Sequence, residues 1–367
     1  MNIEETLPAA IEASVEIPNI EEAEVIVPAQ PFDETLSFFT ERLGFRVAAI
    51  FPANNPACAV VVGHGTRLRL LRDCATPPGT IRLACRDLET PITIEAPNAT
   101  RIELVSSRPP IELPALQPEL AIARYSEGQW VTGRAGMRYR DLIPARQGGR
   151  FGAAHIQIEK GGPVPDYVHY HRVRFQIIYC YRGWVRLAYE DQGPEFVMQA
   201  GDCVLQPPEI RHRVLESSAG LEVVELSSPA EHETLGDLQL ELPNGTPVPG
   251  RRFDGQGFLH HVAEKAAWDP AAYAGFEART IGLGQATEGL LEARVLRCSS
   301  DVSTSVSKHA NELLFRVVLE GKLQLRLDDQ EELQLDRGDA FTVPGGQAHS
   351  MTASAGTTLL EVEVPST

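Results

Sequence analysis

Three histidines in the middle of the chain stand at spacings that let them face one centre. His169 and His171 alternate along one segment, and His212 follows a later turn that contains Pro207. Side chains two residues apart on a strand point to the same face, so the first two imidazoles are predicted to lie together. Imidazole is the commonest protein ligand for transition metals, and the amide of Gln176 is a candidate fourth ligand.

This ligand set predicts the chemistry of the site. Three neutral imidazoles and one amide leave a divalent metal with its full +2 charge, which favours anionic chelating substrates and lowers the pKa of bound water. Gln176 cannot accept a proton, so a base has to come from elsewhere. Arg174 is predicted to share the face of Gln176, where it could clamp a carboxylate, and Tyr167 flanks the histidines. We take Arg174 and Tyr167 as candidate catalytic residues; the alternative is that the arginines pair with acidic side chains.

The histidines belong to two motifs that resemble those of the cupin superfamily. The first reads Gly162, six residues, His169-x-His171, four residues, Gln176, six residues, Gly183; the second runs from Gly201 through Pro207 and Glu209 to His212. Gln176 stands where the family has Glu, and Glu209 where the second motif has its second Gly. The resemblance implies a β-barrel with a metal held by His169, His171, Gln176 and His212. Iron is preferred, with zinc, nickel, manganese or copper as alternatives.

A second copy of the pattern follows with fewer ligands. Its later motif runs from Gly338 to His349, and counting back from Gly321 places Ser307 against His169, His309 against His171 and Leu314 against Gln176. The segments Val223–Leu226 and Leu360–Glu363 also align, as do Ala135–Arg140 and Ala274–Arg279. Only His309 and His349 remain at ligand positions, and Glu312 is out of phase. We therefore expect one metal per chain, in the first barrel.

The remaining sequence agrees with a mainly β protein. Short β-rich runs separated by many of the 30 glycines and 27 prolines are typical of barrels and sandwiches. Near the N-terminus a strand, a helix over residues 32–43 and three strands resemble a half-module of the vicinal oxygen chelate superfamily. That module lacks a first-strand histidine, so we expect it to be structural or dimerising. The predicted fold is thus two tandem cupin jelly-roll barrels preceded by a small α+β module.

The predicted organisation has six parts. They are an acidic leader (1–20), the vicinal-oxygen-chelate-like module (21–105), a Pro-rich linker (106–134), the metal-binding barrel (135–228), a connector (229–273) and the degenerate barrel (274–367).

Charge and composition exclude several classes of function. The formal net charge of −17 disfavours binding to nucleic acid or to anionic membranes. The six cysteines show no zinc-ribbon or disulfide spacing, and no signal peptide or long apolar run is visible. We expect a cytoplasmic protein that forms a homo-oligomer, specifically a dimer, and binds a small anionic molecule.

Two classes of function remain open. The first is a metal-dependent enzyme, preferably an Fe(II)-type dioxygenase acting on a small chelating acid or phenol, with isomerase or lyase chemistry as the alternative. The second is a small-molecule-binding or storage protein without catalysis. The cupin resemblance implies a fold and not a reaction.

Overall fold

The computed structural model describes residues 19–327 and 332–366. The chain divides into two compact units, residues 1–110 and 111–367, which are described separately. Residues 1–18 of the predicted acidic leader lie outside the described residues. None of the described helices is long and apolar enough to cross a membrane.

The first unit contains two small sheets, and the first sheet with its helix has the strand and helix order predicted from the sequence. The larger sheet has the order β1-β4-β3-β2, with β1 parallel to β4, and the smaller has the order β5-β7-β6. The elements are β1 (Val25–Pro28), α1 (Phe32–Ser37), η1 (Phe38–Arg42), β2 (Arg46–Phe51), β3 (Cys58–Gly63), β4 (Thr66–Leu71), β5 (Thr80–Cys85), β6 (Ile92–Glu95) and β7 (Arg101–Ser106). The predicted helix over 32–43 is divided, because its second half, η1, is a π-helical turn. The resemblance to the vicinal oxygen chelate superfamily stays a prediction.

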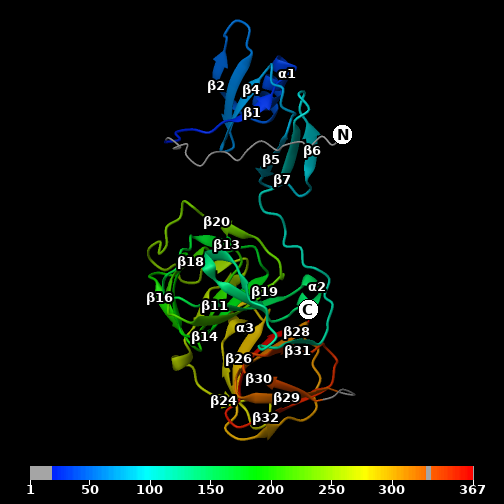
Figure 1. Ribbon diagram of the computed structural model, residues 1–367, viewed down its shortest axis with the longest axis vertical. Helices are drawn as coiled ribbons and strands as arrows, with labels where there is room; N and C mark the ends of the chain where they lie inside the picture. Colours follow the sequence, from blue (N-terminus) through cyan, green and yellow to red (C-terminus); the bar gives the residue numbers. More distant parts are fainter. Residues whose placement is uncertain (1–18, 328–331, 367) are drawn as a thin grey trace, which may run out of the picture. The chain divides into compact units, whose positions relative to one another are not determined.

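The second unit consists of two β-barrels, seen in green and in yellow to red (Figure 1). The first barrel is built from β9 (Val131–Thr132), η2 (Arg134–Gly136), β10 (Arg138–Asp141), α2 (Arg146–Gly149), β11 (Gly152–Ile158), β12 (Gly162–Pro163), β13 (His169–His171), β14 (Phe175–Arg182), β15 (Trp184–Tyr189), β16 (Phe196–Gln199), β17 (Cys203–Gln206), β18 (His212–Ser217), β19 (Leu221–Ser228) and β20 (Thr234–Gly236). The connector adds β21 (Arg252–Phe253), β22 (Gln256–Gly257), β23 (Leu259–His261) and η3 (Ala263–Lys265).

The second barrel follows the same plan. It contains β24 (Asp269–Pro270), β25 (Glu277–Thr280), α3 (Leu283–Ala286), β26 (Glu292–Arg297), β27 (Val302–Ser303), β28 (Leu313–Glu320), β29 (Lys322–Leu327), β30 (Leu333–Asp336), β31 (Ala340–Thr342), β32 (His349–Ala353) and β33 (Thr358–Val364). The mainly β architecture and the duplicated barrels are thus as predicted.

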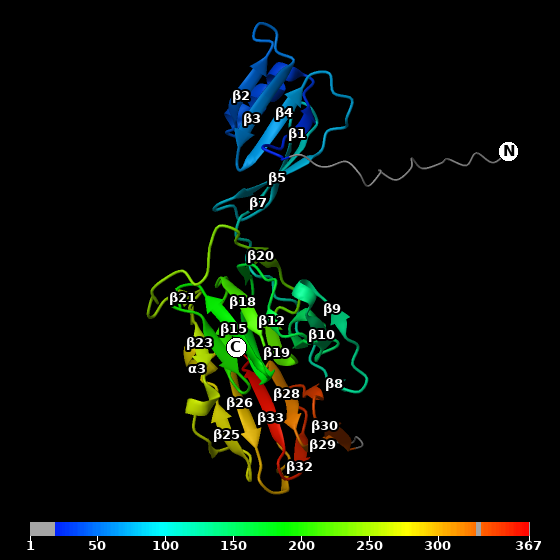
Figure 2. The same cartoon turned by 60° about the vertical axis from the view of Figure 1, so that its left-hand side comes forward.

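Each barrel receives an edge strand from outside its predicted range. The predicted linker contains β8 (Ala121–Ala123), which pairs with β31 of the second barrel. The predicted connector contains β23, which pairs with β17 of the first. These strands extend the larger sheets to β23-β17-β14-β19-β11-β10-β9 and β24-β25-β26-β33-β28-β31-β8. Both β8 and β23 are labelled in Figure 2. Three-residue strands carry too little periodicity to be recognised in the sequence.

The two larger sheets pack on a shared apolar core. It includes Phe151 and Phe175 from the first barrel and Phe315 and Leu360 from the second, all buried. Because this core uses one face of each large sheet, the other face of β14 and β19 is directed into the interior of the first barrel. That interior contains the histidines.

Candidate metal centre

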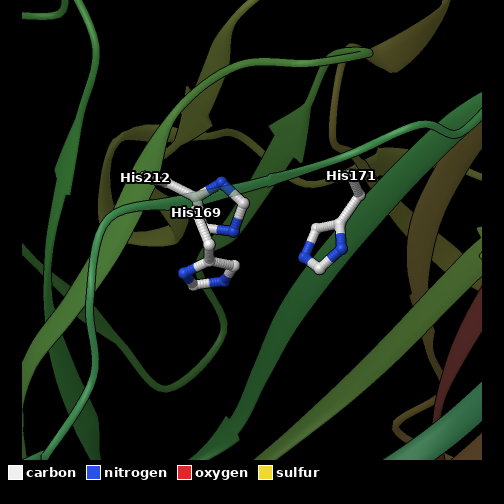
Figure 3. Close-up of side chains that lie close together, drawn as sticks. All are labelled: His169, His171 and His212. Atoms are coloured by element: carbon white, nitrogen blue, oxygen red, sulfur yellow. The ribbon is translucent and has the colours of Figure 1, made fainter. Parts of the chain in front are cut away.

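The three predicted histidines converge inside the first barrel. His169 and His171 occupy alternate positions of β13, and His212, the first residue of β18, pairs directly with His169 across the sheet. The ring centroids lie 4.2 to 5.3 Å apart, and the candidate ligand atoms all lie within 4.8 Å of one another (Figure 3). Within residues 19–327 and 332–366, this is the one such group of three or more His, Cys, Asp or Glu side chains.

Hydrogen bonds fix the tautomer of each imidazole. Nδ1 of His169 donates to the carbonyl of Tyr167 at 2.8 Å, and Nδ1 of His212 donates to that of Ile210 at 3.0 Å. Nδ1 of His171 lies 3.4 Å from the carbonyl of Glu233. Each Nε2 therefore keeps its lone pair. In metal-binding histidines, likewise, one ring nitrogen binds the metal and the other donates a hydrogen bond that fixes the ring.

Burial keeps these imidazoles neutral. It lowers the pKa of His171 to about 3, with the neighbouring histidines adding to the effect. It lowers the pKa of His212 well below its usual value and also lowers that of His169. Metal binding requires unprotonated imidazole, so the three ligands compete little with protons at neutral pH.

Gln176 adds an oxygen that lacks a partner. It is buried on β14, and its Oε1 is buried without a hydrogen bond. Leaving a buried acceptor unpaired costs about 1–3 kcal/mol, so this oxygen is suited to accept a cation or an ordered water in front of it. Three neutral imidazoles and one orphaned amide oxygen fit a divalent transition metal.

Glu225 on β19 is a cavity residue that the sequence analysis did not single out. It lines the same cavity as the histidines, and the Gln176 side chain on the neighbouring strand is its polar partner there. Burial raises its pKa, and the bond from Gln176 partly opposes this shift.

Arg134 is the second residue that the sequence analysis missed. It precedes the sharp bend at Ala135, where φ is 54°, and reaches the cavity from η2. Its guanidinium donates to Nε2 of His169 at 2.9 Å and pairs with the buried carboxylate of Asp166. The guanidinium therefore has to move before His169 can bind a metal through Nε2.

The cavity is small and largely apolar. Its volume is about 100 Å³, and its polar groups are the three histidines, Arg134, Glu225, the two glutamines at 176 and 206, and the tyrosines at 139 and 189. Side chains such as Met137, Ile178, Leu187 and Met198 form the rest of the wall. An organic acid of few atoms fits this combination of a charged group and an apolar lining.

The two candidate catalytic residues lie outside this cavity lining. Arg174 forms an ion pair with Glu312 of the second barrel at 2.9 Å, and Glu312 also pairs with Arg150. Tyr167 is 43% exposed, with its ring 5.9 Å from that of His169 and beside the Arg134 guanidinium. A catalytic role for either residue stays a prediction, and for Arg174 it requires the ion pair with Glu312 to open.

Glu209 departs from the second motif at a strained position. Its φ is 60°, the left-handed conformation for which the family motif has glycine. The strain of a side chain there is of the order of 1–2 kcal/mol. The backbone turn that presents His212 is thus kept although the residue type has changed.

The second barrel has an arginine where the first has its cavity. The guanidinium of Arg316 is fully buried, pairs with Glu361 at 2.5 Å and lies 3.4 Å from Nε2 of His349. Nε2 of His309 donates to the carbonyl of Val343 and is not free to bind a metal. A permanent side-chain cation therefore lies next to the remaining histidine.

The strand registers correct one part of the repeat alignment. Ile178 and Arg316 are equivalent, because each lies five residues before the glycine that ends its motif, Gly183 or Gly321. Ile178 lies opposite Glu225 in the first barrel, and Arg316 lies opposite Glu361 in the second. Glu225 therefore corresponds to Glu361, one residue away from the position given by the sequence alignment.

Known proteins share this fold at low sequence identity. A cupin domain family model matches residues 300–363, in the second barrel. Salicylate 1,2-dioxygenase from Pseudaminobacter salicylatoxidans has a TM-score of 0.52 at 13% identity, covering 69% of this chain and 86% of that one. A mutant of that enzyme in complex with gentisate gives 0.52 at 16% identity, with 69% and 83% covered.

A second kind of solved structure is similar as well. A mutant of oxalate decarboxylase from Bacillus subtilis has a TM-score of 0.50 at 13% identity, covering 70% of this chain and 78% of that one. No curated protein matches the sequence. At such identities the likeness shows the fold alone. The domain match shows a cupin domain in the second barrel, and the two barrels and these neighbours show that residues 111–367 have a duplicated cupin fold.

Proposed function

We propose that the first barrel binds one divalent transition metal, preferably iron, and that the protein is a dioxygenase acting on a small chelating organic acid or phenol. The observation that carries this proposal is the convergence of three neutral, backbone-anchored imidazoles on one buried point. His169, His171 and His212 would hold the metal, with Gln176 as the fourth side chain. When bound, the metal supplies a Lewis-acid centre and a site for oxygen chemistry.

The residues of the chain supply binding and orientation. Arg134 is the cation of the cavity and can pair with a substrate carboxylate, while Asp166 holds its guanidinium at the wall. The apolar residues around it exclude water from the bound molecule. This arrangement supports an anionic substrate with an apolar body, such as an aromatic acid.

Oxygen uptake tests the proposed reaction. Protein loaded with Fe(II) under nitrogen is mixed with air-saturated buffer and salicylate, gentisate or oxalate as probes. Consumption of about one O₂ per product molecule, lost in His171→Ala, supports the dioxygenase. Turnover without O₂ consumption supports the lyase or isomerase alternative, and binding without turnover supports a storage or binding protein.

A further inference from the structure

Gln176 and Glu225 form a pair on adjacent strands of the first-barrel cavity. In the antiparallel register of β14 and β19, Gln176 lies opposite Ser227 and Ile178 lies opposite Glu225. Gln176 and Glu225 both line the cavity, and the Gln176 side chain lowers the pKa of the Glu225 carboxyl as a hydrogen-bond partner. They are therefore diagonal neighbours on the face that contains the histidines.

The chemistry of the two groups sets the direction of the amide. A carboxylate only accepts hydrogen bonds, so the bond to Glu225 uses the amide N–H of Gln176. Oε1 is then the free end of the amide, and it is the atom that is buried without a partner. Oxygen, and not nitrogen, is the atom of an amide that binds a metal.

The second barrel provides an internal comparison. Glu361, the residue that corresponds to Glu225, pairs with the buried cation Arg316 beside His349. In the first barrel the residue opposite Glu225 is the neutral Ile178, and three histidines form the cluster. In the second barrel Glu361 therefore faces a guanidinium. In the first barrel the amide of Gln176 lies between Glu225 and the candidate metal position.

We infer that Glu225 is a positioning residue of the metal site: it holds the Gln176 amide so that Oε1 faces the metal, and it supplies the negative charge that the neutral ligands lack. The carboxylate that the cupin motif has on β14 is thus transposed to β19, one hydrogen bond away from the metal. This inference rests on the proposed function and concerns the same site.

The negative charge of Glu225 affects the affinity of the site for a metal. Three imidazoles and an amide leave a divalent ion with its full charge, whereas Glu225 lowers the net charge of the site by one. Partners that orient metal ligands in this way raise metal affinity, and their loss typically costs about 10- to 100-fold.

The test uses Co(II) as the probe, because both its affinity and its visible spectrum report on the ligands. Calorimetry and spectra are compared for the full-length chain, Glu225→Gln, Gln176→Glu and the double exchange of the two. We expect Glu225→Gln to weaken Co(II) binding about 10- to 100-fold and to shift the spectrum. The double exchange returns the carboxylate to β14, so it should restore the affinity to within a few-fold of wild type.

Two control variants separate an effect on the position of the Gln176 amide from an effect on folding. Glu363→Gln makes the same chemical change on β33, the corresponding strand of the second barrel, and should leave Co(II) binding unchanged. If Glu225→Gln does not fold, Glu225→Asp keeps the charge, shortens the side chain and should show a smaller loss with the same spectral shift.

Failure of this inference and failure of the proposed function give different results. Folded Glu225 variants with wild-type affinity and spectrum overturn this inference while the three-histidine site stands. A wild-type chain that binds no Co(II) overturns the proposed function as well.

Discussion

Nη2 of Arg134 lies 2.9 Å from Nε2 of His169, so a guanidinium is hydrogen-bonded to an atom that the metal needs. The same arginine pairs with Asp166. A bound metal and Arg134 therefore compete for Nε2 of His169. Both are positively charged, so both attract an anionic ligand.

We predict opposite effects of Arg134→Gln on the two kinds of ligand. Removing the competing cation should raise Co(II) affinity by roughly tenfold, about 1.4 kcal/mol. Binding of salicylate to the metal-loaded protein should weaken, because its carboxylate loses a charged donor. Calorimetry measures both, with Arg138→Gln as a control, since Arg138 pairs with the exposed Glu159. Weaker metal binding in Arg134→Gln would be contrary to this competition.

A second prediction concerns the pH dependence of stability in the metal-free protein. His171 has a folded-state pKa of about 3, and the pKa of His212 is also depressed. Because the unfolded chain then binds more protons than the folded one, stability is lost as pH falls from the unfolded value near 6.5. The loss is about 1.4 kcal/mol per pH unit for each such histidine.

Denaturant unfolding of the EDTA-treated protein at pH 7 and pH 5 measures this loss. His171→Gln removes one of the titrating groups and should show a shallower decline. An equal decline in the variant would mean that His171 does not titrate as expected.

A third prediction concerns the buried arginine of the second barrel. Arg316→Met leaves Glu361 with Arg294 as its remaining cation. Breaking a buried pair typically destabilises a protein by about 3–5 kcal/mol, and we expect the low end because Arg294 remains. Thermal unfolding measures the loss, and the metal content should stay at one per chain. Unchanged stability would contradict the structural role of this cation.

The first unit is expected to be dispensable for the metal site. Residues 111–367 form a compact unit that includes β8, the strand exchanged into the second barrel. Deleting residues 1–110 should therefore leave metal affinity within a few-fold of wild type, while oligomerisation or solubility suffers. Light scattering and metal analysis measure the two effects. Loss of the metal from a truncated chain with folded barrels would count against this division.

The sequence was sufficient to predict the histidine cluster. Alternation in His169-x-His171 places both side chains on one face, and the turn before His212 brings a second strand opposite. Local periodicity and a short turn determine this arrangement, so it can be predicted without knowing the rest of the barrel.

Arg134 and Glu225 could not be identified in the same way. Arg134 enters the cavity from a bend outside both motifs. Glu225 lies in a strand whose register against β14 depends on loop lengths, and a shift of one residue exchanges the two faces of a strand. The one-residue error in aligning Val223–Leu226 with Leu360–Glu363 had this effect, and it concealed the equivalence of Glu225 and Glu361.

The stoichiometry of bound metal is the most direct test of the central claim. Elemental analysis of freshly purified protein should give close to one transition-metal ion per chain. His171→Ala should abolish most of this binding, whereas His309→Ala should leave it intact, because Nε2 of His309 is engaged by the carbonyl of Val343. Two metals per chain, or loss of the metal from His309→Ala alone, would contradict the assignment of the site to the first barrel.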